Sequence, residues 1–328
     1  MSLLIVADST NIRFGMFGSS SHCYYRLATN FPANLDLLLI GSSRTRRGII
    51  PDRLGELLSS DGKAASVVNF GHPYADVALD LYLLDSLTRD HRVRRVLIEA
   101  YLDDGANGYS AQSMEEFASM LSYRRIVQSL HDDTQPVPSR IYTFLNQLKI
   151  KITRSLQITL SGRVLKTLYD HDEIDWSRTN ICWTKKLERA EKSEKKPKYV
   201  AEMKADRREF LSKHSGWFDK GYYQPALFTS SDNSWYVAAL RKIVGLAKRR
   251  NIEIIFYYLP GYYDWPPSPA FAKEFQQRIG APIVYPDKSL LRQLQDNGYQ
   301  DSSHLTPAGR EAFTPWLATS VQNAGRAP

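Results

Sequence analysis

The chain has 328 residues, of which 43% are hydrophobic and 24% charged, and it contains no low-complexity tract. This composition is typical of a globular protein with a sizeable buried core. The formal net charge of +8 favours anionic partners such as acidic glycans or anionic lipid. The basic residues are scattered and no nucleic-acid motif accompanies them, so we expect no nucleic-acid partner.

The two cysteines, Cys23 and Cys182, are too few for a disulfide-rich scaffold or a cysteine metal cluster. They leave a single disulfide across a long loop as an open alternative. The histidines show no metal-ligand spacing, so we expect no metal and no organic cofactor. No stretch approaches the roughly 20 apolar residues of a membrane span. The apolar start at residues 3–7 is too short for a signal-peptide core, which leaves the remnant of a removed anchor as an open alternative.

Five short runs rich in Val, Ile and Leu, each followed by turn residues, predict buried parallel strands. Between them, apolar residues at helical spacing predict helices. A helix should open at Pro51, and others should cover Ala75–Leu87, Ser231–Lys248 and Thr306–Val321. This alternation predicts a three-layer α/β sandwich with a five-stranded, mainly parallel sheet. The expected strands are Leu35–Ile40, Ala65–Phe70, Arg95–Tyr101, Ile252–Leu259 and Pro282–Tyr285.

We expect one domain over residues 1–328, interrupted by a helical insertion at residues 105–230 that contains no convincing strand. An insertion after the third strand would form a cap over the carboxyl edge of the sheet. Ligands bind at that edge in open α/β sheets. Specificity for a substrate is therefore expected to reside in this insertion.

The first strand leads directly into Gly41-Ser42-Ser43-Arg44-Thr45. We expect the glycine to let the backbone turn sharply, and the next serine to stand at the carboxyl end of the strand before a helix. The free N–H groups of a helix start favour developing negative charge. This placement is suited to a nucleophilic serine. The glycine patterns of a phosphate loop and of a dinucleotide fold are both absent.

The second chemical motif lies near the other end, at Asp301-Ser302-Ser303-His304, directly before Leu-Thr-Pro-Ala-Gly. An Asp three residues before a His can fold back onto the imidazole. It would then hold the ring in one tautomer and stabilise the imidazolium, as a serine triad requires. We therefore predict Ser43 as nucleophile, His304 as base and Asp301 as its orienting acid.

In these two motifs the chain resembles the SGNH (GDSL-like) hydrolases, and the resemblance covers roughly residues 34–103 and 231–323. It implies a flavodoxin-like SGNH fold and an oxyanion hole made by the backbone N–H groups of Ser43 and Gly71. The family has an Asn after its third strand, where this chain has Asp103. An ionised Asp cannot donate a hydrogen bond, so Asn107 is the alternative donor.

Within that superfamily the chain is most similar to proteins of alginate O-acetylation and teichoic-acid D-alanylation. This resemblance implies an esterase or O-acyltransferase outside the cytoplasm, in the periplasm or on a membrane anchor. It would act on a glycan or cell-envelope polysaccharide, with a membrane-bound acyltransferase as its partner. Substrate contacts are expected from Arg44, Asn69, His72 and Tyr262.

Three alternatives stay open at this point. The chain could be a catalytically weak or inactive SGNH-like module that binds polysaccharide in an envelope assembly, which Asp103 favours. It could be a phosphate- or nucleotide-binding α/β domain, an alternative that only the predicted fold supports. The nucleophile could also be Ser9, since Ala7-Asp8-Ser9 follows another apolar run.

Overall fold

The structure is a computed structural model, and it describes residues 27, 30–59, 62–72, 75, 77–89, 91–102, 180–182, 197–213, 225–228 and 234–324. The chain divides into two compact units. One comprises Met1–Phe31 and Gly108–Glu188, and the other comprises Pro32–Asn107 and Arg189–Pro328. The first unit lies almost entirely outside the described residues. Residues 189–230, which we had expected in the insertion, group with the unit that contains the sheet.

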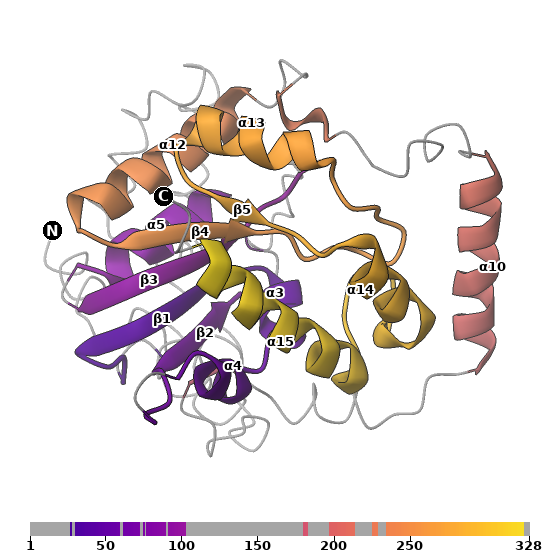
Figure 1. The fold of residues 1–328 in the computed structure, drawn as a ribbon, viewed down its shortest axis with the longest axis horizontal. Coiled ribbons are helices and arrows are strands. Elements are labelled where there is room, and N and C mark those ends of the chain that lie inside the picture. The colour runs from indigo at the N-terminus through magenta and orange to yellow at the C-terminus, as the bar shows by residue number, and fades with distance from the viewer. Residues whose placement is uncertain are drawn as a thin grey trace, which may run out of the picture. The chain divides into compact units, whose positions relative to one another are not determined.

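The second unit is built on a five-stranded sheet in the order β2-β1-β3-β4-β5, in which every neighbouring pair is parallel (Figure 1). The predicted α/β fold class and all five predicted strands are confirmed, with ends that differ by up to three residues. The order is that of flavodoxin-like folds. The strands are β1 (Asn34–Gly41), β2 (Val67–Gly71), β3 (Arg92–Glu99), β4 (Glu253–Tyr257) and β5 (Ile283–Val284).

The central strands carry continuous apolar runs, Leu37–Ile40 in β1 and Val96–Ile98 in β3, because helices cover both faces of the sheet there. Leu38, Leu39 and Ile40 of β1 are each 0% exposed, as are Val96 and Leu97 of β3. A strand buried on both faces shows a continuous apolar run instead of an alternating pattern. This burial is the physical reason why the strands could be recognised in the sequence.

Helices form the two outer layers (Figure 1). On one face α5 (Val77–Leu87) packs against α12 (Ser234–Arg249), which also contacts α13 (Pro269–Ile279). On the other face α15 (Pro307–Ala324) packs against α3 (Ser43–Gly48) and α4 (Pro51–Leu57). The remaining described elements are α10 (Pro197–Lys213), η4 (Ala226–Phe228), α14 (Lys288–Gln293) and η6 (Leu294–Gly298). Within the described part of the chain, no helix has the length and apolar character needed to cross a bilayer.

The order of the strands identifies the edge where a ligand would bind. The chain leaves β1 toward β2 on one side and leaves β3 toward β4 on the other, so the connections diverge between β1 and β3. Crevices open at such a switch point, outside the carboxyl ends of the strands. Ser42 follows the end of β1 there, and Glu99 is the last residue of β3.

Candidate active site

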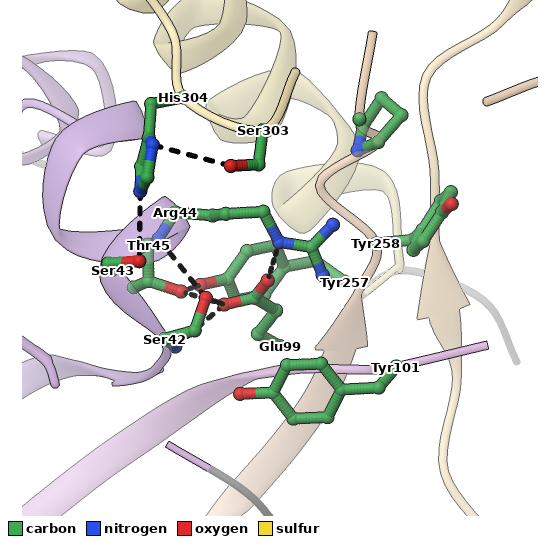
Figure 2. A network of polar contacts seen from close by, with 12 residues as sticks. Ser42, Ser43, Arg44, Thr45, Glu99, Tyr101, Tyr257, Tyr258, Ser303 and His304 are labelled. Carbon is green, nitrogen blue, oxygen red and sulfur yellow. Dashed lines mark hydrogen bonds and ion pairs between the residues drawn. The ribbon is translucent and has the colours of Figure 1, made fainter. Parts of the chain in front are cut away.

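Ser43 and His304 meet at this edge although 261 positions separate them in the sequence. Ser43 is the first residue of α3, immediately after β1 and the N-cap Ser42. Its Oγ lies 2.9 Å from Nε2 of His304 (Figure 2). Both side chains are partly exposed. The pair is therefore close enough for proton transfer and open enough for a substrate to approach.

Asp301 holds the other side of the imidazole ring. Nδ1 of His304 lies 2.9 Å from Oδ1 and 2.9 Å from Oδ2 of the carboxylate. The backbone N–H groups of Ser303 and His304 also donate to Oδ1, at 2.9 and 2.8 Å. Partial burial acts to raise the pKa of Asp301, but the hydrogen bond and charge of His304 and these two N–H groups outweigh it. The pKa of Asp301 therefore lies well below its usual range, which keeps the carboxylate ionised as an acceptor.

The loop that carries Asp301 and His304 is closed at its base by backbone contacts. Tyr299 and Leu305 form an antiparallel bridge. The Gln300 N–H donates to the His304 carbonyl at 2.8 Å. The glycine of Leu-Thr-Pro-Ala-Gly is needed here, because a Cβ on Gly309 would lie 2.1 Å from the carbonyl oxygen of Gly298. Gly309, which follows His304 in the sequence, thus allows the segment after the histidine to pack closely against η6.

The backbone N–H of Ser43 is available to a ligand. Next to it, the Arg44 N–H donates to Ser42 Oγ at 3.1 Å. The Arg46 N–H donates to the Ser42 carbonyl at 3.2 Å. Among the residues that the structure describes, none accepts a hydrogen bond from the Ser43 N–H. This N–H group is one of the two that the resemblance implies for an oxyanion hole, and that role stays a prediction.

The prediction that Gly71 supplies a second oxyanion donor is wrong in this structure. Its N–H donates to Oδ1 of Asn69 at 3.0 Å, inside the protein. Asn69 itself is 0% exposed, and its Nδ2 donates to the carbonyls of Thr45 and Ile49 at 3.0 and 3.2 Å. The expected substrate contact by Asn69 is wrong for the same reason. Its amide joins β2 to the segment around α3 and cannot reach a substrate.

Two further predicted substrate contacts are wrong because the side chains are buried. His72 is 1% exposed, and its backbone N–H donates to the Gly41 carbonyl at 2.7 Å. Tyr262 is 2% exposed and packs edge-on against Tyr299, with 5.6 Å between the ring centroids. Both side chains are packed inside the protein and are not exposed to a substrate. The predicted residues Ser9, Asp103 and Asn107 lie outside the described residues.

The Arg44 side chain remains partly exposed next to Ser43 in the sequence. Its Nε donates to Oε1 of Glu99 at 2.8 Å, its guanidinium carbon lies 6.0 Å from the ring centroid of Tyr101, and its side chain is 19% exposed. Burial acts to lower the pKa of Arg44, but the negative charges of Glu99 and Asp264 and the phenols of Tyr258 and Tyr101 together raise this pKa above its usual value. No acceptor in the described part of the chain meets the two terminal amino groups. They can bind a substrate oxygen.

Glu99 is the site residue that the sequence reasoning missed. Its side chain is 0% exposed, and its Oε2 accepts hydrogen bonds from the Ser42 N–H at 2.7 Å and the Thr45 hydroxyl at 2.6 Å. A signal was present in the sequence. An ionisable residue directly after Val96-Leu97-Ile98 stands where the strand is buried on both faces, and such a charge requires partners.

These contacts define what the site can do chemically. A serine hydroxyl hydrogen-bonded to an imidazole, which is in turn held by a carboxylate, is the arrangement that activates serine as a nucleophile. Among the described residues there is no group of three or more His, Cys, Asp and Glu side chains suited to holding a metal ion.

Comparisons with known proteins do not assign a family. No protein-family model matches the chain, and no curated protein matches it. Among solved structures, the chain is similar to one from Bacteroides fragilis described as a "putative acylhydrolase", with 12% sequence identity and a TM-score of 0.39 over 90% of this chain and 93% of the other. That similarity is too low to bear on function.

Proposed function

We propose that this protein is a serine esterase or O-acyltransferase that acts through Ser43, His304 and Asp301. The observation that carries the proposal is the continuous series of contacts from Ser43 Oγ to His304 Nε2 at 2.9 Å and from His304 Nδ1 to the Asp301 carboxylate at 2.9 Å. With its proton on Nδ1, the imidazole offers Nε2 as the base for the serine hydroxyl.

The first half-reaction acylates the serine. Ser43 Oγ attacks the ester carbonyl carbon as its proton moves to His304 Nε2, and the carbonyl oxygen becomes an oxyanion. The Ser43 N–H donates to this oxyanion, a type of contact that is typically worth roughly 10²–10³ in rate. The bond from carbon to the leaving oxygen then breaks, and His304 gives its proton to that oxygen.

The second half-reaction releases the acyl group. His304 Nε2 takes a proton from water or from a sugar hydroxyl, whose oxygen attacks the acyl carbon. The bond to Ser43 Oγ breaks and the proton returns from His304 to the serine. Water as acceptor makes the protein an esterase, and a sugar hydroxyl makes it an O-acyltransferase. Asp301 stays ionised throughout and stabilises the imidazolium.

We further propose a glycan of the cell envelope as substrate, a location outside the cytoplasm and a membrane-bound acyltransferase as partner. The net charge of +8 and the terminal amino groups of Arg44 support an acidic glycan. Cys182 is disulfide-bonded, and disulfides persist mainly in oxidising compartments. The remaining support is the resemblance to envelope-polysaccharide O-acetylation proteins.

Steady-state hydrolysis of 4-nitrophenyl acetate tests the proposed chemistry. We expect turnover by the wild type and its loss in Ser43→Ala and in His304→Ala. Ser302→Ala is the matched control, because this serine lies in the same loop as His304 and its side chain is exposed. Turnover that survives in Ser43→Ala would contradict the assignment. A wild type that binds acidic polysaccharide and hydrolyses no ester would favour the binding-module alternative.

A second experiment distinguishes water from a sugar hydroxyl as the acyl acceptor. The protein is given an acetyl donor together with a neutral or an acidic oligosaccharide, and the sugar is analysed by mass spectrometry. An O-acyltransferase adds 42 Da per acetyl group to the sugar, about the mass of C2H2O, whereas an esterase yields only acetate. Preference for the acidic oligosaccharide, and its loss in Arg44→Gln, would support the proposed glycan. Equal use of both sugars would contradict it.

A further inference from the structure

The Glu99 carboxylate lies beneath the nucleophile loop and takes no part in the proton relay. We infer that Glu99 is a positioning residue, which fixes Ser43 by holding the residues on both sides of it. The inference rests on the proposed function and adds a component to the same site. It follows from contacts that join the end of β3 to Ser42 and to the first turn of α3 (Figure 2).

Four donors converge on this one carboxylate, and all come from residues that flank Ser43. Oε2 accepts from the Ser42 N–H at 2.7 Å, from the Ser42 hydroxyl at 2.8 Å and from the Thr45 hydroxyl at 2.6 Å. Oε1 accepts from Arg44 Nε at 2.8 Å. The residue before Ser43 and the two residues after it are thus all hydrogen-bonded to the Glu99 carboxylate. Ser43 Oγ is left to face His304.

The loop lies so close to Glu99 that only glycine fits at the end of β1. A Cβ on Gly41 would lie 2.6 Å from Cβ of Glu99 and 2.2 Å from Oγ1 of Thr45. Gly41 has no positive φ, so the turn from β1 into α3 does not use the left-handed backbone conformation that glycine favours. Its role is to allow this close approach. The Tyr257 hydroxyl, on the neighbouring strand β4, supports the same contact by meeting Oγ1 of Thr45 at 2.5 Å.

The carboxylate cannot be replaced by a neutral group of the same shape without loss. An ionised carboxylate only accepts hydrogen bonds, which matches four donors. An amide at this position would turn one N–H toward a donor and leave Arg44 without its counter-charge. A buried charge that loses its partner is costly, so the loop would shift to reach other partners. A displacement of about 1 Å in a catalytic group can lower the rate roughly 100-fold.

The test combines kinetics with NMR of histidine-labelled protein, in which the His304 signals are identified by their absence in His304→Ala. The variants are Glu99→Gln, Thr45→Val, which removes one donor, and Thr45→Ser, which restores the hydroxyl. Asp85→Asn is the matched control, because it breaks the ion pair with Arg250, at 2.5 Å, without touching the site. Thr45→Val keeps the test usable if Glu99→Gln does not fold.

We expect Glu99→Gln to lower kcat roughly 100-fold with KM changed by less than about threefold. Its His304 ring signals should move toward those of Ser43→Ala, because the serine no longer meets the imidazole. Thr45→Val should do the same to a smaller degree, and Thr45→Ser should restore most of the loss. Asp85→Asn should lower the melting temperature and leave kcat and the His304 signals as in the wild type.

The two readouts separate this inference from the proposed function. If the wild type has no esterase activity but the His304 signals still move in Glu99→Gln, the positioning role holds and the proposed function falls. If folded Glu99→Gln keeps the wild-type signals and rate, the positioning role is overturned. It is also overturned if the rate of Glu99→Gln falls only in proportion to its unfolded fraction.

Discussion

His304 is bonded twice to Asp301, once through Nδ1 of the ring at 2.9 Å and once through its backbone N–H, which donates to Oδ1 at 2.8 Å. The same carboxylate therefore fixes both the main chain and the ring of the histidine. This double contact explains why the two residues lie three positions apart in the sequence. A carboxylate further away in the sequence could orient the ring but would not close the loop.

Asp301→Asn should preserve the loop and destroy the chemistry. The amide oxygen can still accept the backbone N–H of His304, but the ring loses the charge that stabilises the imidazolium. We expect kcat for 4-nitrophenyl acetate to fall by roughly 10³–10⁴, as in other serine triads. A loss of less than about tenfold in a folded variant would contradict the role assigned to Asp301.

The same contact makes stability depend on pH. The pKa of Asp301 is lower in the folded protein than in the unfolded chain, so its contribution to the free energy of unfolding is complete above the unfolded value of 3.8. The contribution declines as the pH falls below that value toward the lowered pKa. Urea unfolding of the wild type and of Asp301→Asn should therefore differ at pH 7 and converge in acid. If the difference in the free energy of unfolding between the two proteins grew on acidification, the prediction would be contradicted.

Gly41→Ala should disturb the loop by overpacking. The added methyl would meet Thr45 Oγ1 at 2.2 Å and Glu99 Cβ at 2.6 Å, and neither group lies at the end of a flexible side chain. We expect destabilisation of about 1–3 kcal/mol in urea unfolding, together with a lower kcat. Gly245→Ala in α12 is the control, because the nearest atom to its Cβ would lie 3.5 Å away. That variant should be stabilised by about 0.5–1 kcal/mol, and equal destabilisation of both variants would contradict the steric account.

Asn69→Ala should affect stability and leave substrate preference unchanged. It removes the partner of the Gly71 N–H and of the carbonyls of Thr45 and Ile49, all inside the protein. Each unsatisfied buried group costs about 1–3 kcal/mol. The ratio of kcat/KM between an acidic and a neutral acetylated sugar should stay that of the wild type. A change in that ratio would restore Asn69 as a substrate contact.

The parts of this protein that could be predicted from the sequence have a local signature. Strands buried on both faces show continuous apolar runs, so β1 and β3 could be placed within a few residues. Ser43 follows the end of such a run, and Asp301 and His304 lie three positions apart, so these residues could be named before the structure brought them together. The helix α13 (Pro269–Ile279) was missed although its buried residues Phe271, Phe275 and Ile279 recur every four positions.

The remaining errors concern the direction in which a side chain or N–H group points. Asn69, Gly71 and His72 lie at or just after the carboxyl end of β2, as expected, but the sequence does not show that the Asn69 amide is hydrogen-bonded inside the protein. Tyr262 was expected to contact substrate because it lies in a Tyr- and Trp-rich segment, yet its ring packs against Tyr299. Glu99 was missed because its four donors come from Ser42 and the first turn of α3, which meet Glu99 only once β1 and β3 pair.

The central claim is that Ser43 is a nucleophile activated by His304. Treatment with a fluorophosphonate, followed by mass spectrometry of the intact protein and of its proteolytic peptides, tests this claim most directly. We expect one adduct per chain, on the peptide that contains Ser43, with labelling lost in Ser43→Ala and slowed in His304→Ala. An adduct on Ser9 or elsewhere, or no adduct on folded wild-type protein, would contradict the claim.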